Sequence, residues 1–181
     1  GASAIVGGEA AAGAIDGVIG IGGANGSTMF CAVMRALAVG LPKAMVTPVA
    51  ATAAVQWYVA ESDIAMFPTI GDISLNRITR DAITNAANAM AGMARAYRSG
   101  RERAVAAVSP PLIGVSSFGN TQAAVDRITQ RLEAEGFEVI HFHASGPGGR
   151  ALESLTAKGE IAGVVDVTTH ELTDLVVDGV Y

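Results

Sequence analysis

The sequence has a single cysteine, Cys31, among its 181 residues, and this scarcity excludes an internal disulfide. Charged residues are also few, at 16%, and the net charge of −5 argues against nucleic acid as the primary partner. No apolar run reaches the roughly 18 residues that a membrane-spanning helix needs, and no signal peptide is visible. These absences predict a cytoplasmic protein without membrane association, in which Cys31 is a buried small hydrophobe and not a nucleophile.

Hydrophobic residues, in contrast, make up half of the chain, which is enough to build a core. Short apolar segments alternate with longer segments of helical character. Strands are predicted at 17–21, 43–47, 64–67, 112–116, 138–142 and 163–167, and helices at 27–37, 74–98, 121–135, 149–158 and 170–177. This alternation predicts right-handed βαβ units, and therefore an α/β fold with Rossmann-like parallel sheets and flanking helices.

The pattern is interrupted at Ser109-Pro110-Pro111, after which a new strand begins. We therefore expect a lobe boundary between about 99 and 111. Residues 1–105 are assigned to the C-terminal part of a first Rossmann-like lobe, and residues 106–181 to the N-terminal part of a second.

A short internal repeat favours two related lobes, because residues 13–21 align without a gap with residues 159–167. The alternative is that there was no duplication, because all βαβ units share a helix end, a glycine and a buried strand in this order, and that alone would produce so short a match. Related lobes would face each other across a cleft, which is a common place for ligands. The chain begins in an Ala-rich helix and stops at a helix end, so we expect it to be a fragment of a longer unit.

Two glycine-rich loops each follow a predicted strand and precede a predicted helix. The first contains Gly22, Gly23, Gly26 and Ser27, with Ser27 or Thr28 as the N-cap of the helix. Free backbone N–H groups and the helix dipole suit a phosphate or carboxylate at such a turn, and glycine permits its close approach. The spacing matches neither the dinucleotide fingerprint nor the P-loop, so a turn that merely packs a helix against a sheet is the alternative.

The second loop contains Gly146, Gly148 and Gly149 and is followed by Arg150. A cation in the first turn of a helix is unfavourable to the helix dipole, so Arg150 indicates an anionic ligand. The alternative is a surface ion pair with Glu153. A third loop, residues 116–121, also follows a strand and is rich in hydroxyl groups. All three loops lie at the carboxyl ends of strands, which favours one shared site.

His143 and Asp166 are the candidates for acid–base catalysis. His143 lies at a strand end beside the second glycine loop, and a hydrogen-bonded structural histidine is its alternative role. Asp166 interrupts an apolar strand, where a buried carboxylate needs a partner. It serves as a base, orients a ribose or Mg²⁺, or caps the turn that contains Thr168. No third ligand accompanies His141 and His143 at a metal-binding spacing, so we predict no metal bound by side chains alone.

Several segments together, in this order, carry a family resemblance: residues 16–23, 26–27, 41–46, 62–66, 76–78, 91–93, 111–114, 142–150 and 166–172. They resemble the tomato mosaic virus resistance protein (Tm-type) ATP-binding family, over nearly the whole chain. The resemblance implies two Rossmann-like lobes, ATP as a cofactor, with or without Mg²⁺, and self-association into a homo-oligomer. It also implies a protein partner for the plant member, whereas bacterial members mostly lack an assigned reaction.

We therefore predict a protein that binds ATP or another small phosphate-containing ligand. The glycine loops and Arg150 would hold its phosphates, with Thr168 or Asp166 nearer the sugar or metal. One alternative is an enzyme acting on a small phosphorylated or carboxylate substrate in the cleft between lobes. The other is an interaction protein in which the nucleotide is structural.

Overall fold

The computed structural model describes residues 1–104 and 109–180, with the side chains of 102–104 left out. The chain divides into two compact units, residues 1–106 and 107–181, and each has its own parallel three-stranded sheet. The predicted boundary between residues 105 and 106 lies outside the described residues.

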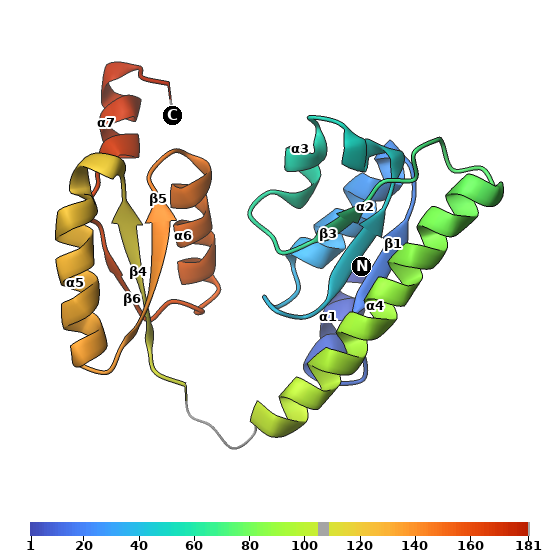
Figure 1. The fold of residues 1–181 in the computed structure, drawn as a ribbon, viewed down its shortest axis with the longest axis horizontal. Coiled ribbons are helices and arrows are strands. Elements are labelled where there is room, and N and C mark those ends of the chain that lie inside the picture. The colour runs from blue at the N-terminus through green and yellow to red at the C-terminus, as the bar shows by residue number, and fades with distance from the viewer. Residues whose placement is uncertain (105–108, 181) are drawn as a thin grey trace. The chain divides into compact units, whose positions relative to one another are not determined.

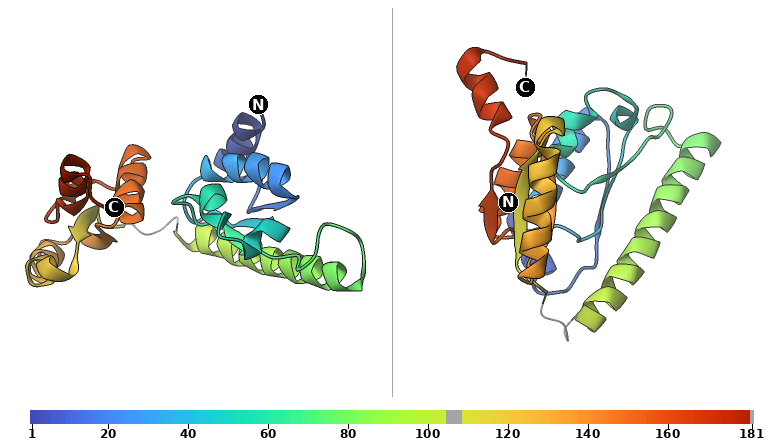
Figure 2. Two further views of the ribbon diagram at one scale, coloured as in Figure 1. Left: turned by 90° about the horizontal axis from the view of Figure 1, so that it is seen from above. Right: turned by 60° about the vertical axis from the view of Figure 1, so that its left-hand side comes forward.

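The first unit places a sheet between helices (Figure 1). Its elements are α1 (Ala2–Ala11), β1 (Val18–Ile21), α2 (Ala24–Arg35), β2 (Lys43–Val46), the 3-10 helix η1 (Pro48–Ala51), α3 (Val55–Val59), β3 (Ala65–Phe67) and α4 (Arg77–Ala104). Strand β2 is central, pairs in parallel with β1 and β3, and is buried along its whole length. Helix α2 covers one face of this sheet and α4 the other, as Figure 2 shows from above.

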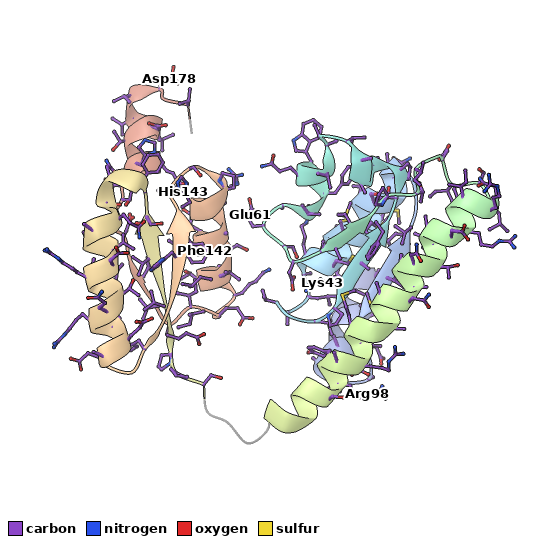
Figure 3. All side chains as sticks on the ribbon, viewed as in Figure 1. Lys43, Glu61, Arg98, Phe142, His143 and Asp178 are labelled. Atoms are coloured by element: carbon purple, nitrogen blue, oxygen red, sulfur yellow. The ribbon has the colours of Figure 1, made fainter. Side chains whose placement is uncertain are left out.

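The core of the first unit follows from the alternation of side chains along β2. Met45 packs with Cys31 and Met34 of α2 in one apolar cluster. On the opposite face of the sheet, ion pairs hold α4 in place. Arg98, labelled in Figure 3, and Arg101 both form ion pairs with the buried carboxylate of Asp16, in the turn before β1.

The second unit has β4 (Leu112–Ser117) at the centre of its sheet, between β5 (Glu138–His143) and β6 (Gly163–Val165). All three strands are parallel. The remaining elements are η2 (Gly119–Thr121), α5 (Gln122–Ala134), α6 (Pro147–Ala157) and α7 (His170–Val177). Helices α5 and α6 lie on opposite faces of the sheet, and α7 lies beyond the carboxyl ends of β4 and β5 (Figure 1).

The strand register decides which residues of the second unit face which helix. Residues paired across parallel strands point to the same face, so Ile113 and its partner Val139 pack with Val125 of α5. The alternate residues face α6, where Phe142 packs with Leu152. A cavity that both of these residues line opens on this second face of the sheet.

Parallel sheets flanked by helices confirm the predicted α/β fold class, and strands and helices form at every predicted place. The predicted N-cap of α2 is wrong. The helix begins at Ala24, with Gly23 as its N-cap. Ser27 does not cap the helix, because its side chain is buried and its hydroxyl donates a hydrogen bond to Thr47 Oγ1. The sequence did not predict η1 or α3. In the part of the chain that is described, no helix is both long and apolar enough to span a bilayer.

Candidate functional site

A cavity of about 710 Å³ opens in the second unit, at the carboxyl ends of β4 and β5 and beside β6. Its apolar lining includes Phe142, Leu152, Val164, Leu172 and Leu175, and its polar lining includes Ser116, Glu153, Asp166, Thr168 and Glu171. The ionisable side chains among the described lining residues are all carboxylates. A ligand therefore meets apolar walls, hydroxyl groups and negative charge.

The register of β4 and β6 explains how Ser116 and Asp166 come together. Val115 pairs with Val165, so the residues that follow them lie side by side on the α6 face. The Ser116 hydroxyl donates to Asp166 Oδ1 at 2.5 Å, and the Thr168 N–H donates to Ser116 Oγ at 2.9 Å. The expectation that Asp166 is buried is wrong: β6 ends at Val165, and the side chain of Asp166 is exposed.

Thr168 connects this pair to the hydroxyl-rich loop after β4. Its side chain is 8% exposed, and its Oγ1 lies 2.7 Å from Thr121 Oγ1. Thr121 Oγ1 also accepts a hydrogen bond from the N–H of Phe118 at 3.1 Å. The loop at 116–121 and the turn after β6 thus form one hydrogen-bonded unit, a pairing that the sequence did not predict.

The second glycine loop holds a carboxylate from its own chain. The N–H groups of Gly146 and Gly149 both donate to Glu171 Oε1, the latter at 3.2 Å. A Cβ at Gly149 would overlap the Glu171 carboxylate, and a Cβ at Gly148 would overlap the carbonyl oxygen of His143. Glycine is therefore required at both positions, one for an anion and the other for the tight turn.

Glu171 was not among the predicted site residues. The one signal for it in the sequence is an acidic residue in the first turn of the predicted helix 170–177. Such a residue ordinarily indicates an interaction with the dipole of its own helix, not with a loop elsewhere. Arg150, which was predicted, is exposed on the first turn of α6 and does not line the cavity.

The first glycine loop has mainly a packing role in the structure. A Cβ at Gly22 would lie 2.9 Å from Gly26 Cα, so these glycines bring the first turn of α2 against the end of β1. Ser27 is fully buried and donates to Thr47 Oγ1 at 2.8 Å. Gly23 has open space around it. Because the two glycine loops belong to different units, their shared site stays a prediction.

His143 and Asp166 are not brought together. His143 lies on the α5 face of the sheet, where its Nδ1 is 2.8 Å from Ser145 Oγ and its ring centroid is 4.9 Å from that of Phe118. Asp166 lies on the α6 face and lines the cavity, which His143 does not. Among the described residues, no cluster of three or more His, Cys, Asp or Glu side chains is arranged to hold a metal ion.

Comparison with known proteins gives matches along almost the whole chain. The chain is 39% identical over 166 residues to the ToMV resistance protein Tm-1(GCR237) of Solanum lycopersicum, which covers 91% of this chain and 22% of that protein. It is 44% identical over 167 residues to a UPF0261 protein of Rhizobium meliloti, and 41% identical over 167 residues to one of Clostridium tetani. Each of these two matches covers 92% of this chain and 40% of the relative.

The chain thus spans two fifths or less of the length of these relatives. Residues 1–99 match the N-terminal domain of the Uncharacterised protein family (UPF0261), and residues 110–181 match its C-terminal domain. These matches confirm the family resemblance found in the sequence, and they do not test the ATP binding that the resemblance implies. The chain belongs to the uncharacterised protein family UPF0261.

Proposed function

We propose that the second unit binds a small phosphate-containing ligand, a nucleotide such as ATP, in the cavity at the strand ends. The observation that supports this most strongly is the convergence of the Gly146 and Gly149 N–H groups on the Glu171 carboxylate. Carboxylate and phosphate oxygens are acceptors of the same kind for such donors. In this proposal the Glu171 carboxylate stands in for a phosphate oxygen, and an incoming phosphate would replace it.

The charge of the cavity favours a ligand that carries a cation. Glu153, Asp166 and Glu171 all line it, and three carboxylates repel a bare polyphosphate. Mg²⁺ in proteins is typically held by one or two carboxylates together with the ligand's phosphates, and not by a cage of side chains. We therefore propose that the nucleotide binds as its Mg²⁺ complex, and that omitting Mg²⁺ weakens binding.

Calorimetric titration of ATP with Mg²⁺ into the wild type and Glu171→Gln tests this proposal. Glutamine keeps the shape of the side chain but removes the charge that competes with the phosphate. Binding to Glu171→Gln is expected to be roughly fivefold tighter, since a charge at a helix N-terminus contributes about 1 kcal/mol. Gly149→Ala is expected to abolish binding, because the added methyl group occupies the position of the anion.

Glu153→Gln is the matched control for the charge change. Glu153 lines the same cavity from α6, and among the described hydrogen bonds none joins it to the glycine loop. Its effect on binding should be smaller than that of Glu171→Gln. Absence of binding to both the wild type and Glu171→Gln, in samples shown by circular dichroism to be folded, would overturn the proposed function.

We propose neither a reaction nor an antiviral role. The two acid–base candidates, His143 and Asp166, lie on opposite faces of the sheet. The ToMV susceptible protein tm-1(GCR26) of Solanum lycopersicum matches this chain with the same 39% identity as the resistance protein, so this similarity does not distinguish resistance from susceptibility. Self-association is proposed from exposed apolar side chains of α7 that do not line the cavity, Val176 and Val177, and light scattering of the purified chain tests it.

A further inference from the structure

We propose that Asp166 determines the specificity of the cavity, by accepting hydrogen bonds from the vicinal hydroxyl groups of a sugar on the ligand. This inference rests on the proposed function, because it adds a sugar to the phosphate ligand. It assigns the two ends of that ligand to two parts of the cavity: the phosphate to the glycine loop at 146–149, and the sugar to the end of β6.

The orientation of Asp166 is set by a buried hydroxyl group. Ser116 is 5% exposed, and its Oγ accepts from the N–H of Thr168 at 2.9 Å. A serine hydroxyl has one hydrogen to donate, and here that hydrogen goes to Asp166 Oδ1 at 2.5 Å. Thr168 is held in turn by Thr121. The carboxylate is therefore positioned before any ligand arrives, which lowers the entropic cost of binding.

Most of the acceptor capacity of Asp166 is open to a ligand. An ionised carboxylate offers about four lone-pair positions and no donor. Within the described residues, the bond from Ser116 is the one hydrogen bond that Asp166 makes, and the side chain is exposed and lines the cavity. A neutral group that binds beside Asp166 must therefore supply hydrogen-bond donors.

A phosphate cannot satisfy this requirement, because an ionised phosphate only accepts hydrogen bonds and is repelled by the carboxylate. The hydroxyl groups of a sugar are neutral donors, and two neighbouring hydroxyls match the two oxygens of one carboxylate. Apolar side chains of Val164 and Leu172 line the same cavity and suit the C–H faces of a sugar ring. The donors of the glycine loop serve the phosphate end once the phosphate has replaced Glu171, so the two ends of a sugar phosphate have different places.

The test compares three probes, each with Mg²⁺: ATP, 2′,3′-dideoxy-ATP and inorganic tripolyphosphate. Their affinities are measured by calorimetry for the wild type, Asp166→Ala and Ser116→Ala. The wild type is expected to bind ATP roughly tenfold or more tightly than the dideoxy compound, as expected for hydrogen bonds to a charged group. Asp166→Ala is expected to bring this ratio close to one and to leave tripolyphosphate binding in place.

Ser116 is a positioning residue, so Ser116→Ala is expected to lower the ratio partly and not to abolish it. Glu153→Gln is the control, since it removes another carboxylate of the cavity and should keep the full ratio. A loss of folding cannot imitate the expected result, because tripolyphosphate binding reports an intact glycine loop in each variant.

Two results would overturn the inference while the proposed function stands. One is equal affinity of the wild type for ATP and its dideoxy analogue. The other is an unchanged ratio in Asp166→Ala, including the case in which only the Mg²⁺ dependence changes, which would assign the carboxylate to the metal. If neither ATP nor tripolyphosphate binds, the proposed function fails and the inference fails with it.

Discussion

At the scale of single residues, buried polar side chains hold loops in place in both units. Lys43 is 1% exposed, and its Nζ donates to the carbonyl oxygens of Ala38 and Leu41 at 2.8 and 2.9 Å and to Asp63 Oδ1 at 2.7 Å. Ser116 has a comparable place in the second unit. In each case the polar group of the side chain has hydrogen-bond partners. Removing the side chain therefore leaves buried donors or acceptors without a hydrogen bond.

Lys43→Met is therefore expected to destabilise the first unit. Methionine fills a similar volume but removes the hydrogen bonds to the carbonyl groups of Ala38 and Leu41, of which that of Leu41 is buried. The expected cost is about 1–3 kcal/mol in the free energy of unfolding. Urea unfolding followed by circular dichroism measures it. Arg127→Met is the control, because it also replaces a cationic side chain by methionine, at an exposed position of α5. Equal stability of the two variants would show that the contacts of Lys43 contribute little.

The partner of Lys43 makes the first unit sensitive to acid. Burial raises the pKa of Asp63, but hydrogen bonds from Lys43 and the Gly40 N–H, together with the charge of Lys43, outweigh it and lower the pKa overall. A carboxyl group whose pKa is lower in the folded state stabilises the fold above its unfolded pKa of about 4, and the effect disappears as the pH falls through the folded value.

The difference in the free energy of unfolding between the wild type and Asp63→Asn should therefore be constant from about pH 7 to 5 and shrink below about pH 4. Urea unfolding at a series of pH values measures it. A difference that persists at low pH would mean that Asp63 stabilises the unit by a contact that does not depend on its charge.

The single cysteine should be unreactive in the folded protein. Cys31 is fully buried, and burial raises the pKa of its thiol despite the lowering effect of the Arg35 charge. The thiolate is the reactive species, so both access and ionisation oppose modification. We expect slow labelling by a thiol reagent in buffer and rapid labelling of one group in guanidinium chloride. Fast stoichiometric labelling of the native protein would contradict the packing of α2.

At the scale of elements, glycines decide how closely helices approach strands. A Cβ at Gly114, in the middle of β4, would lie 2.5 Å from Leu152 Cδ1 of α6. Because Gly114 has no side chain, Leu152, which lines the cavity, can pack directly against the sheet. The sequence marks such a position only as a strand interrupted by glycine, a pattern that also occurs at bulges and tight bends.

Gly114→Ala is expected to lower the free energy of unfolding by about 1–3 kcal/mol, the usual cost of overpacking a core. Thermal unfolding followed by circular dichroism measures it. Gly119→Ala is the control in the same unit, since nothing lies within 4 Å of its added Cβ and a change within about 0.5 kcal/mol is expected. A similar loss in both variants would point to backbone conformation and not to contact with Leu152.

At the scale of the whole molecule, the candidate cavity belongs to one unit. All of its lining residues lie between Ser116 and Leu175, within the unit formed by residues 107–181. Residues 107–181 expressed alone are therefore expected to bind ATP with Mg²⁺ as tightly as the full chain, within about threefold. Calorimetry on both proteins measures this, with circular dichroism to establish that the shorter one is folded. A folded fragment without affinity would show that residues 1–106 contribute to the site.

The sequence by itself determined the order of the strands and of the longer helices, though not η1 or α3, because apolar periodicity and strand ends are local properties of the chain. It also singled out Gly149, Asp166 and Thr168, which line one cavity in the structure, because parallel strands bring their carboxyl ends to one edge. Glycine loops and polar residues at strand ends are visible without knowledge of what packs against them.

Only the tertiary structure decided which of these residues share a site. The register of β4 with β6 set Ser116 beside Asp166, while the alternation along β5 turned His143 to the other face. The contact of Glu171 with the second glycine loop, and of Ser27 with Thr47, joins residues far apart in the chain. Such pairings depend on the strand register and on how helices pack, and no local pattern of residues encodes them.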